Sequence, residues 1–439
     1  MKIFDKFGVQ IPEILLPKNI NLKTWSVIAC DQYTQDFSYW KSVKETVGTD
    51  FSTLNLIFPE VYLNEENPEE RIKTIKNTMK DYIEKDIFNP SQQCVYIERK
   101  TAYGRTRKGL VLAIDLEKYE WQPNSKALIR ATEATVPERI PPRMKIRTNA
   151  PLELPHIMLL ANDEDDLLIG KCAENAKKAS PIYDGDLMEQ SGHITGWAVK
   201  GSEAESIIET ALETLYKKGT DSQGNTFLFA VGDGNHSLAT AKAVWDEYKK
   251  NLSEEEQATS PIRYALVEIV NIYDEGLTFE PIHRVMFNFD TEDLINYVCE
   301  KLNGNTQIFN NEDLLKKAIE EKSEIGARYG FIYIKNGITQ FKMIQTNIKD
   351  LAIAALQPIL DSYMNEKSAQ KTQIDYIHGT DEVTALGKIE NNTGILLPPI
   401  AKDSFFATIN GRGPLPRKSF SMGEASEKRF YVEARKLFS

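Results

Sequence analysis

Residues 226–237 read TFLFAVGDGNHS, an apolar run that ends in a glycine-rich turn. A continuously apolar run of this kind is typical of a strand that is covered on both faces. Beyond the turn, Leu238, Ala241, Trp245 and Tyr248 lie at i, i+3, i+7 and i+10, which places them on one face of a helix. A buried strand that turns into a helix predicts an α/β or α+β fold, with mixed sheets and flanking helices.

Short apolar runs elsewhere in the chain predict further elements of the same fold. We expect buried strands over 25–30 and 144–147. A last helix is expected to begin at Ser421, with Glu424 completing its cap. Hairpins are expected across the turns Tyr103-Gly104 and Asn336-Gly337.

Composition excludes several classes of protein. The 439 residues include 53 basic and 64 acidic side chains, a net charge of −11 that disfavours nucleic acid and anionic membranes as partners. The sequence contains no apolar run of the roughly 18 residues that a membrane span needs. The N-terminus carries charges and does not resemble a signal peptide. The four cysteines form no CxxC pair, which favours a reducing compartment. We therefore expect a cytoplasmic protein, either a monomer or a homo-oligomer.

The length predicts more than one domain. We expect an N-terminal α+β domain over 1–190, a domain carrying the glycine-rich turn over 191–289, and a helix-rich α+β region over 290–439. The Gly- and Ser-containing stretch 183–201 is the expected linker.

The turn itself carries the chemistry that the sequence suggests. Gly232 and Gly234 allow positive φ and a close backbone approach, and the N–H groups of the following helix favour an anion. Asp233 is a candidate acid–base group or Mg²⁺ ligand, and His236 a candidate proton donor or acceptor. Asn235 and Ser237 would add phosphate contacts. The alternative is a tight strand–helix turn in which Asn235 serves only as N-cap.

A basic segment precedes this turn in the sequence. If 143–147 is extended, period two puts three cations on one face, where they would repel one another unless an anion or acidic residues such as Glu133 compensate. Arginine suits bidentate phosphate contacts. The candidate anion-binding residues of this segment are Arg139, Arg143, Lys145 and Arg147.

Four further residues are candidates for function. Arg284 could supply another cation, with a structural ion pair as the alternative. Glu138 could be a general base or a partner of its neighbouring arginine. Asp31 follows an expected strand and could bind a metal or close an Asx turn. His156 lies in an apolar run and is interpreted as a core histidine.

The sequence resembles a known family at several points along its length. It is similar to the bacterial and archaeal family called domain of unknown function one-thousand-fifteen. The segments that carry this resemblance are 29–34 (ACDQYT), 130–133 (RATE), 138–143 (ERIPPR), 154–158 (LPHIM), 232–242 (GDGNHSLATAK) and 415–425 (LPRKSFSMGEA).

The turn also resembles, more distantly, that of the ParB/sulfiredoxin superfamily, which includes ATP-dependent sulfiredoxin, CTP-binding partition proteins and free-serine kinases. Asp233, Gly234 and His236 match that turn, and the resemblance implies a similar core that binds nucleotide phosphates. Ser237 stands where the superfamily has a basic residue, so a cation from elsewhere in the chain would have to replace it.

These observations lead to three hypotheses. The first is a phosphotransfer or phosphoester enzyme that uses Mg²⁺ and ATP, ADP or another nucleotide, and acts on a small metabolite. By the resemblance, this metabolite would be serine or phosphoserine, in the kinase or phosphatase direction. The second is a nucleotide-sensing or ParB-like regulator without turnover, and the third a metabolite-binding protein. The chain has no GxxxxGK[ST], HExxH, GxSxG or GxGxxG motif, which disfavours the enzyme classes that carry them.

Overall fold

The computed structural model describes residues 2–19, 21–366 and 373–438, and this part of the chain divides into two compact units. The first unit comprises Met1–Leu277 and Gly423–Ser439, and the second comprises Thr278–Met422. The last segment of the chain therefore returns to the unit in which the chain began. This division differs from the three regions expected from the sequence.

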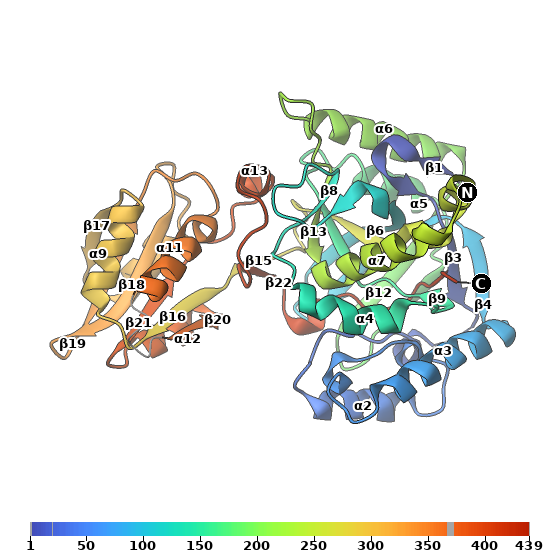
Figure 1. Ribbon diagram of the computed structural model, residues 1–439, viewed down its shortest axis with the longest axis horizontal. Coiled ribbons are helices and arrows are strands. Elements are labelled where there is room, and N and C mark those ends of the chain that lie inside the picture. The colour runs from blue at the N-terminus through green and yellow to red at the C-terminus, as the bar shows by residue number, and fades with distance from the viewer. Residues whose placement is uncertain (1, 20, 367–372, 439) are drawn as a thin grey trace. The chain divides into compact units, whose positions relative to one another are not determined.

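A mixed sheet forms the centre of the first unit (Figure 1). Its main path runs through β11 (Tyr183–Asp186), β12 (Gly192–Val199), β5 (Cys94–Thr101), β6 (Thr106–Asp115), β14 (Tyr264–Asn271), β10 (Met158–Ala161), β13 (Phe229–Asp233), β8 (Ile129–Ala131) and β7 (Tyr119–Glu120). Strand β10 pairs parallel with β14 and antiparallel with β13, which itself pairs parallel with β8. β1 (Ile3–Phe4) and β2 (Val9–Gln10) extend the sheet beside β6.

This sheet continues across the domain boundary that was expected at 190–191. The stretch expected to be a linker forms the antiparallel β11–β12 hairpin. Strand β12 then pairs with β5, and β14 pairs with β6, so segments on both sides of the expected boundary share one sheet.

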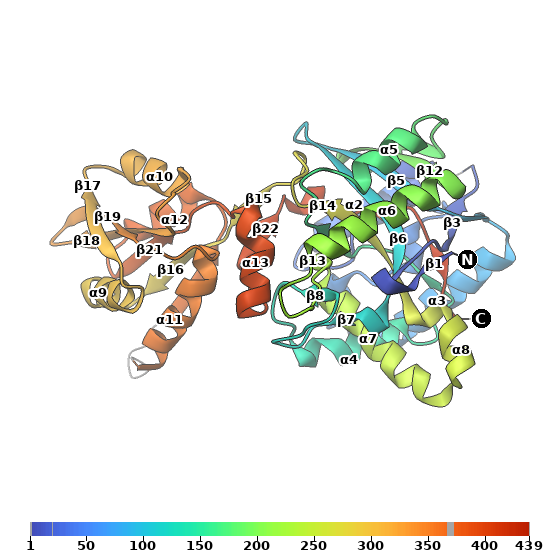
Figure 2. The same cartoon turned by 90° about the horizontal axis from the view of Figure 1, so that it is seen from above.

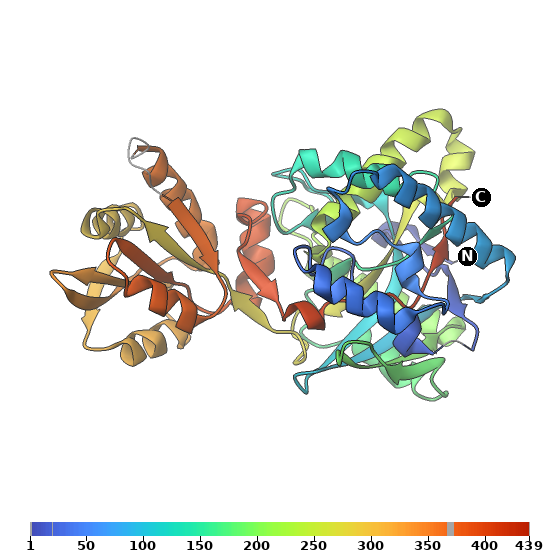
Figure 3. The same cartoon turned by 90° about the horizontal axis from the view of Figure 1, so that it is seen from below.

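Helices cover both faces of the first unit's sheet. On one face lie α5 (Ile169–Ala176), α6 (Ser202–Lys218) and α7 (Asn235–Tyr248), whose apolar residues pack with Leu112 and Leu159 (Figure 2). On the other face lie α2 (Phe37–Val47) and α3 (Pro68–Glu84), which pack with Val111 and Leu266 (Figure 3). The alternation of Val111 and Leu112 between the two cores follows from the period of two in a strand.

The second unit is a smaller antiparallel sheet between helices. Its strands follow the order β17 (Asn305–Phe309), β19 (Ile338–Gln345), β18 (Arg328–Lys335), β21 (Asn392–Leu396), β16 (His283–Phe287) and β20 (Gln373–Ile377). One core holds α9 (Thr291–Lys301) and α11 (Ala352–Glu366), and the other holds α10 (Glu312–Glu320) and α12 (Thr380–Gly387). Outside these layers lie α13 (Lys402–Arg412) and the pair β15 (Phe279–Pro281) and β22 (Phe420–Met422).

The remaining elements of the first unit are short. They are β3 (Glu13–Pro17), β4 (Phe88–Gln92), β9 (Leu152–Glu153), β23 (Arg435–Lys436), α1 (Leu22–Trp25), α4 (Ile140–Arg147) and α8 (Glu254–Thr259). None of the helices among the described residues has the length and hydropathy that a bilayer span requires. The expected α+β class, with mixed and antiparallel sheets between helices, is confirmed.

Three expected elements are wrong in type. The segment 25–30 ends helix α1 and continues as an extended chain, in which Ile28 forms an isolated bridge with Phe430. The segment 143–147 is the second half of helix α4, because Pro141 and Pro142 lie in its first turn, where proline is favourable. In place of a terminal helix, the chain forms β22, a 3₁₀ turn over Ala425–Glu427 and an extended segment that ends in β23.

Candidate functional site

The β13–α7 turn has the conformation that its glycines allow. Gly234 is the N-cap of α7 with φ of 80°, and a Cβ there would lie 3.1 Å from the Ile157 backbone, so glycine is favoured. Its N–H donates to Asp233 Oδ1 at 2.9 Å. Because Gly234 has no side chain, no side-chain cap covers the first N–H groups of α7. The helix therefore presents backbone donors and the positive end of its dipole at this turn.

Asn235 and His236 hold a neighbouring loop in place. Asn235 Oδ1 accepts a hydrogen bond from the Thr132 N–H at 3.2 Å, and His236 Nε2 accepts one from the Val136 N–H at 3.2 Å. The Nε2 lone pair of His236 is thus engaged by the backbone. The proton-transfer role expected for His236 stays a prediction, and it would have to use Nδ1.

Lys428 supplies a cation at this turn. Its Nζ lies 3.3 Å from Asp233 Oδ2, and the two side chains are 12% and 23% exposed. The sequence lacks the basic residue that follows the motif histidine in the ParB/sulfiredoxin turn. Sequence reasoning missed Lys428 because the residue lies near the C-terminus, in a segment that was expected to be helical.

A chain of hydrogen-bonded side chains starts at Ser237 in the first turn of α7. Ser237 Oγ lies 2.7 Å from His156 Nε2, and His156 Nδ1 lies 2.8 Å from the Tyr431 hydroxyl. The Tyr431 oxygen accepts the Cys30 N–H at 3.1 Å. His156 was interpreted as a core histidine, yet the structure joins it to one of the candidate phosphate-binding residues.

Asp31, Glu60 and Arg143 form a second polar cluster next to this chain. Glu60 is held by its N–H, which donates to the Cys30 carbonyl at 2.8 Å, and its carboxylate pairs with Arg143. Burial raises the pKa of the Glu60 carboxyl, and nearby Asp31 adds to this effect while Arg143 opposes it. Glu60 could not be found from the sequence, because its partner Arg143 lies in helix α4, far along the chain.

The other members of the basic segment do not converge on the turn. Since 143–147 is helical, the expected face of three cations is wrong. Lys145 binds Glu69 at 2.8 Å and Arg147 binds Glu153 at 2.5 Å, so carboxylates compensate these charges. Glu138 and Arg139 are exposed. Of this segment, Arg143 belongs to the polar cluster through its pair with Glu60.

Arg284 lies in the second unit and is fully buried. Its Nε donates to Gln357 Oε1 at 2.9 Å, and its guanidinium lies 4.8 Å from the centre of the Tyr376 ring. These contacts, with a neutral amide and an aromatic ring, hold the guanidinium inside the second unit, and the anion-binding role of Arg284 stays a prediction.

The part of the chain that the structure describes contains no group of three or more His, Cys, Asp or Glu side chains arranged to hold a metal. Asp233 already contacts Gly234 and Lys428, and Asp31 Oδ1 accepts a hydrogen bond from Gln32 at 3.1 Å. Mg²⁺ is commonly bound by one or two carboxylates together with substrate phosphates. Asp233 fits that kind of site, and both aspartates stay predicted ligands.

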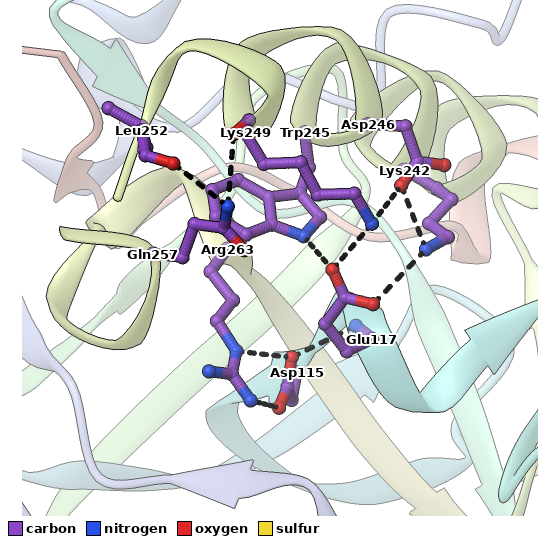
Figure 4. Close-up of polar contacts among 9 residues, drawn as sticks. All are labelled: Asp115, Glu117, Lys242, Trp245, Asp246, Lys249, Leu252, Gln257 and Arg263. Atoms are coloured by element: carbon purple, nitrogen blue, oxygen red, sulfur yellow. Dashed lines mark hydrogen bonds and ion pairs between the residues drawn. The ribbon is translucent and has the colours of Figure 1, made fainter. Parts of the chain in front are cut away.

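The far end of α7 is fixed by a charged network around Glu117 (Figure 4). Glu117 Oε1 accepts hydrogen bonds from Trp245 Nε1 at 2.5 Å and from Lys249 Nζ at 2.7 Å. Beside it, Asp115 pairs with Arg263 at 2.6 Å. These contacts hold the C-terminal end of the helix whose first turn carries the site.

The fold and the site define an α+β protein with an open helix N-terminus, a paired lysine and a serine–histidine contact. Residues 14–373 match the family of proteins of unknown function designated DUF1015. The chain belongs to this family, which confirms the resemblance inferred from its motifs. No curated protein sequence matches the chain significantly.

Solved structures resemble the chain weakly. A free serine kinase in complex with AMP is 10% identical with a TM-score of 0.35, over 74% of this chain and 92% of that one. SbnI from Staphylococcus aureus with a C-terminal truncation is 8% identical with a TM-score of 0.34, over 71% and 83%. A conserved hypothetical protein from Pyrococcus furiosus is 10% identical with a TM-score of 0.32, over 71% and 90%. At these scores the likenesses carry no argument about activity.

Proposed function

We propose that the chain is a phosphoryl-transfer enzyme that uses a nucleotide and acts on a small metabolite. The observation that carries this proposal is the position of Lys428 beside Asp233 at the uncapped N-terminus of α7. Phosphoryl transfer depends mainly on positioning and on positive groups that stabilise the phosphate charge. A helix N-terminus and an adjacent lysine are groups of this kind.

The residues around the turn divide into two roles in this proposal. Gly232 and Gly234 let the phosphates approach the backbone closely, the backbone N–H of Ser237 binds them, and Lys428 takes the place of the basic residue that the motif lacks. Asp233 would hold Mg²⁺, which when bound would neutralise phosphate charge. The ion pair between Asp233 and Lys428 orients both side chains before the nucleotide arrives.

Glu60 is the group best suited to accept a proton from a substrate hydroxyl. It is partly buried, its pKa is raised mainly by burial, and Arg143 holds it in place. A carboxyl with a raised pKa is a better base at neutral pH than an ordinary one. Glu138, the base suggested by the sequence, is exposed and has no comparable surroundings. Serine and phosphoserine are the first substrates to test, because of the resemblance of the turn.

Phosphorus NMR tests the proposal directly. The chain is incubated with Mg²⁺ and ATP, ADP or CTP, with serine or phosphoserine present, and the nucleotide and product signals are followed. We expect turnover, and we expect Asp233→Asn to abolish it. Lys428→Met should weaken nucleotide binding about tenfold to a hundredfold, as expected for one lost charge-assisted hydrogen bond. The matched control is Lys171→Met, which removes an exposed lysine paired with Glu174.

Two outcomes would contradict the proposal in different ways. Tight nucleotide binding without turnover of any substrate would favour a nucleotide-sensing regulator. An absence of nucleotide, phosphate and metal effects on thermal stability would leave the turn with a structural role.

Because all five tryptophans lie in the first unit, their fluorescence reports on binding and unfolding of the unit that carries the site.

A further inference from the structure

Three side chains from distant parts of the chain form a relay at the first turn of α7. Ser237 Oγ lies 2.7 Å from His156 Nε2, and the Tyr431 hydroxyl lies 2.8 Å from His156 Nδ1. The rings of His156 and Tyr431 meet edge to face at 83°. A nucleophile in contact with a base, which is in turn oriented by a third group, is the arrangement that activates a serine hydroxyl.

The partners of Tyr431 allow the histidine tautomer that this role requires. The Tyr431 oxygen accepts the Cys30 N–H through one lone pair, and its other lone pair can accept the Nδ1–H of His156. His156 Nε2 then keeps its lone pair for the Ser237 hydroxyl. Tyr431 is 1% exposed and burial raises its pKa, so its hydroxyl stays neutral and acts as an orienting group.

We propose that Ser237 is a catalytic nucleophile that becomes phosphorylated, with His156 as its general base and Tyr431 as a positioning residue. This proposal rests on the phosphoryl-transfer function. Ser237 Oγ attacks the terminal phosphorus of a nucleoside triphosphate, so that an O–P bond forms and the bond to the bridging oxygen breaks. The Ser237 proton passes to His156 Nε2, and the nucleoside diphosphate leaves with the electron pair. In the second step a substrate hydroxyl oxygen attacks the phosphorus on Ser237 and loses its proton to Glu60. The bond from phosphorus to Ser237 Oγ breaks, and Oγ takes back the proton held by His156 Nε2.

The surroundings of Ser237 suit a phosphoserine. Ser237 is the third residue of α7, where a phosphoryl group meets the backbone N–H donors and the positive end of the helix dipole. Lys428 stands at the same turn, paired with Asp233. Ser237 and His156 are both partly exposed, as the proposed transfer from a nucleotide requires. Ser237 thus places a nucleophile at the proposed phosphate site.

Intact-mass measurement and peptide mapping after incubation with ATP and Mg²⁺ test this inference. We expect one phosphoryl group on Ser237 in the unaltered chain and none in Ser237→Ala. Ser202→Ala is the matched control, because Ser202 lies in the first turn of α6 in the same unit. Tryptophan fluorescence on urea titration verifies that each variant is folded.

The two partners of Ser237 are tested by rate. Loss of a general base typically costs about a hundredfold or more, so His156→Gln should slow phosphorylation by at least that factor. Tyr431→Phe should slow it less and change the pH dependence of the rate, because the ring of His156 loses its orienting partner. A merely structural contact would leave the pH dependence unchanged in the folded variant.

The outcomes separate this inference from the function on which it rests. Turnover of substrate by Ser237→Ala at the original rate, with no phosphorylated protein, would overturn the inference and leave direct transfer. Phosphate mapped to another residue would also overturn it. Failure of the chain to bind or consume nucleotide at all would overturn both. Phosphorylation of Ser237 without transfer to a metabolite would support the inference and contradict the enzyme function.

Discussion

Arg429→Met should cost the first unit a large part of its stability. Arg429 is 1% exposed, and its side chain donates to the Pro155 carbonyl at 2.9 Å, to Glu268, and to Glu433 Oε2 at 2.6 Å. Both carboxylates are fully buried, and Glu268 keeps only a 3.4 Å contact with Arg107. Methionine fills a similar volume but removes the guanidinium from both carboxylates, so that Glu433 keeps the Tyr183 hydroxyl as a donor at 2.5 Å and Glu268 keeps Arg107.

The magnitude follows from the cost of an uncompensated buried charge. Removing one partner of a buried ion pair typically destabilises a protein by about 3–5 kcal/mol, and Arg429 serves two carboxylates at once. The control is Lys171→Met, which breaks an exposed pair with Glu174 and should cost no more than about 1 kcal/mol. Urea unfolding followed by tryptophan fluorescence measures both variants in the first unit alone.

The loss of stability in Arg429→Met should depend on pH. Burial opposes ionisation of Glu268, but Arg107 and Arg429 outweigh it and hold the pKa of this carboxyl below its ordinary value. In the unaltered chain this stabilisation is present above the unfolded pKa of about 4.3 and is lost as pH falls through the folded pKa. In Arg429→Met the pKa rises, so the deficit should be largest near neutral pH and should narrow in acid. A loss below about 1 kcal/mol, or one that is independent of pH, would refute the reasoning.

Three smaller perturbations test other contacts. Glu117→Gln keeps an acceptor for Trp245 but removes the charge, so calorimetry should detect a loss of at most about 1 kcal/mol because the pair is partly exposed. Gly109→Ala would place a Cβ 2.4 Å from Glu268 Oε1, and urea unfolding should give a loss of about 1–3 kcal/mol, whereas an unchanged midpoint would contradict this packing. Partial burial of His193 opposes its charge, but the two aspartates of its own hairpin raise its pKa. The stabilisation by protonated His193 is therefore complete below about pH 6.5 and is lost as pH rises through its raised pKa. An NMR titration of the His193 ring should detect this raised pKa.

The sequence predicted the elements whose signals are local. The β13–α7 unit follows from a buried apolar run, a glycine-rich turn and a helical apolar face, all within 25 residues or so of one another. The strand expected over 25–30 failed because an apolar segment is buried equally well as an extended chain that packs in a core. The segment 144–147 was expected to be a strand because its charged residues alternate with apolar ones. It is helical because Pro141 and Pro142 favour the first turn of a helix, a signal that the interpretation did not weigh enough.

The candidate site was predicted only in part, because its members come from separate elements. The turn residues Asp233 and Ser237 could be named from local sequence, and Asp31 from its place after an apolar run. Lys428 and Glu60 could not, because neither lies in a distinctive motif. Their roles depend on which segments pack beside β13 and α4, and such pairings leave no trace in sequence spacing.

The C-terminal segment has a sequence pattern that indicates an extended chain, although a helix was expected there. From 427 to 435 the sequence is EKRFYVEAR, in which polar or ionisable residues at odd positions alternate with apolar ones from Phe430 onward. This period of two indicates an extended chain, whereas a helix beginning at Ser421, with Glu424 in its cap, had been expected here.

Alternation usually predicts a strand with one face in water, but both faces of this segment are buried. The apolar side chains Phe430, Val432 and Ala434 belong to one hydrophobic core. The polar side chains bind partners inside the protein instead of water; these contacts are Glu427 with Arg105, Arg429 with Glu268, Tyr431 with His156, Glu433 with Tyr183, and Arg435 with Glu153.

These buried pairs also fix the register of the segment. A shift by one residue would exchange the two faces and bury charges against the apolar core, at a cost of several kcal/mol per unpaired ion. The same register brings Lys428 to Asp233 and Tyr431 to His156. The ion pairs of Arg429 therefore position the residues on which the proposed chemistry depends. It follows that Arg429→Met should lower nucleotide binding and Ser237 phosphorylation even at temperatures where the first unit remains folded.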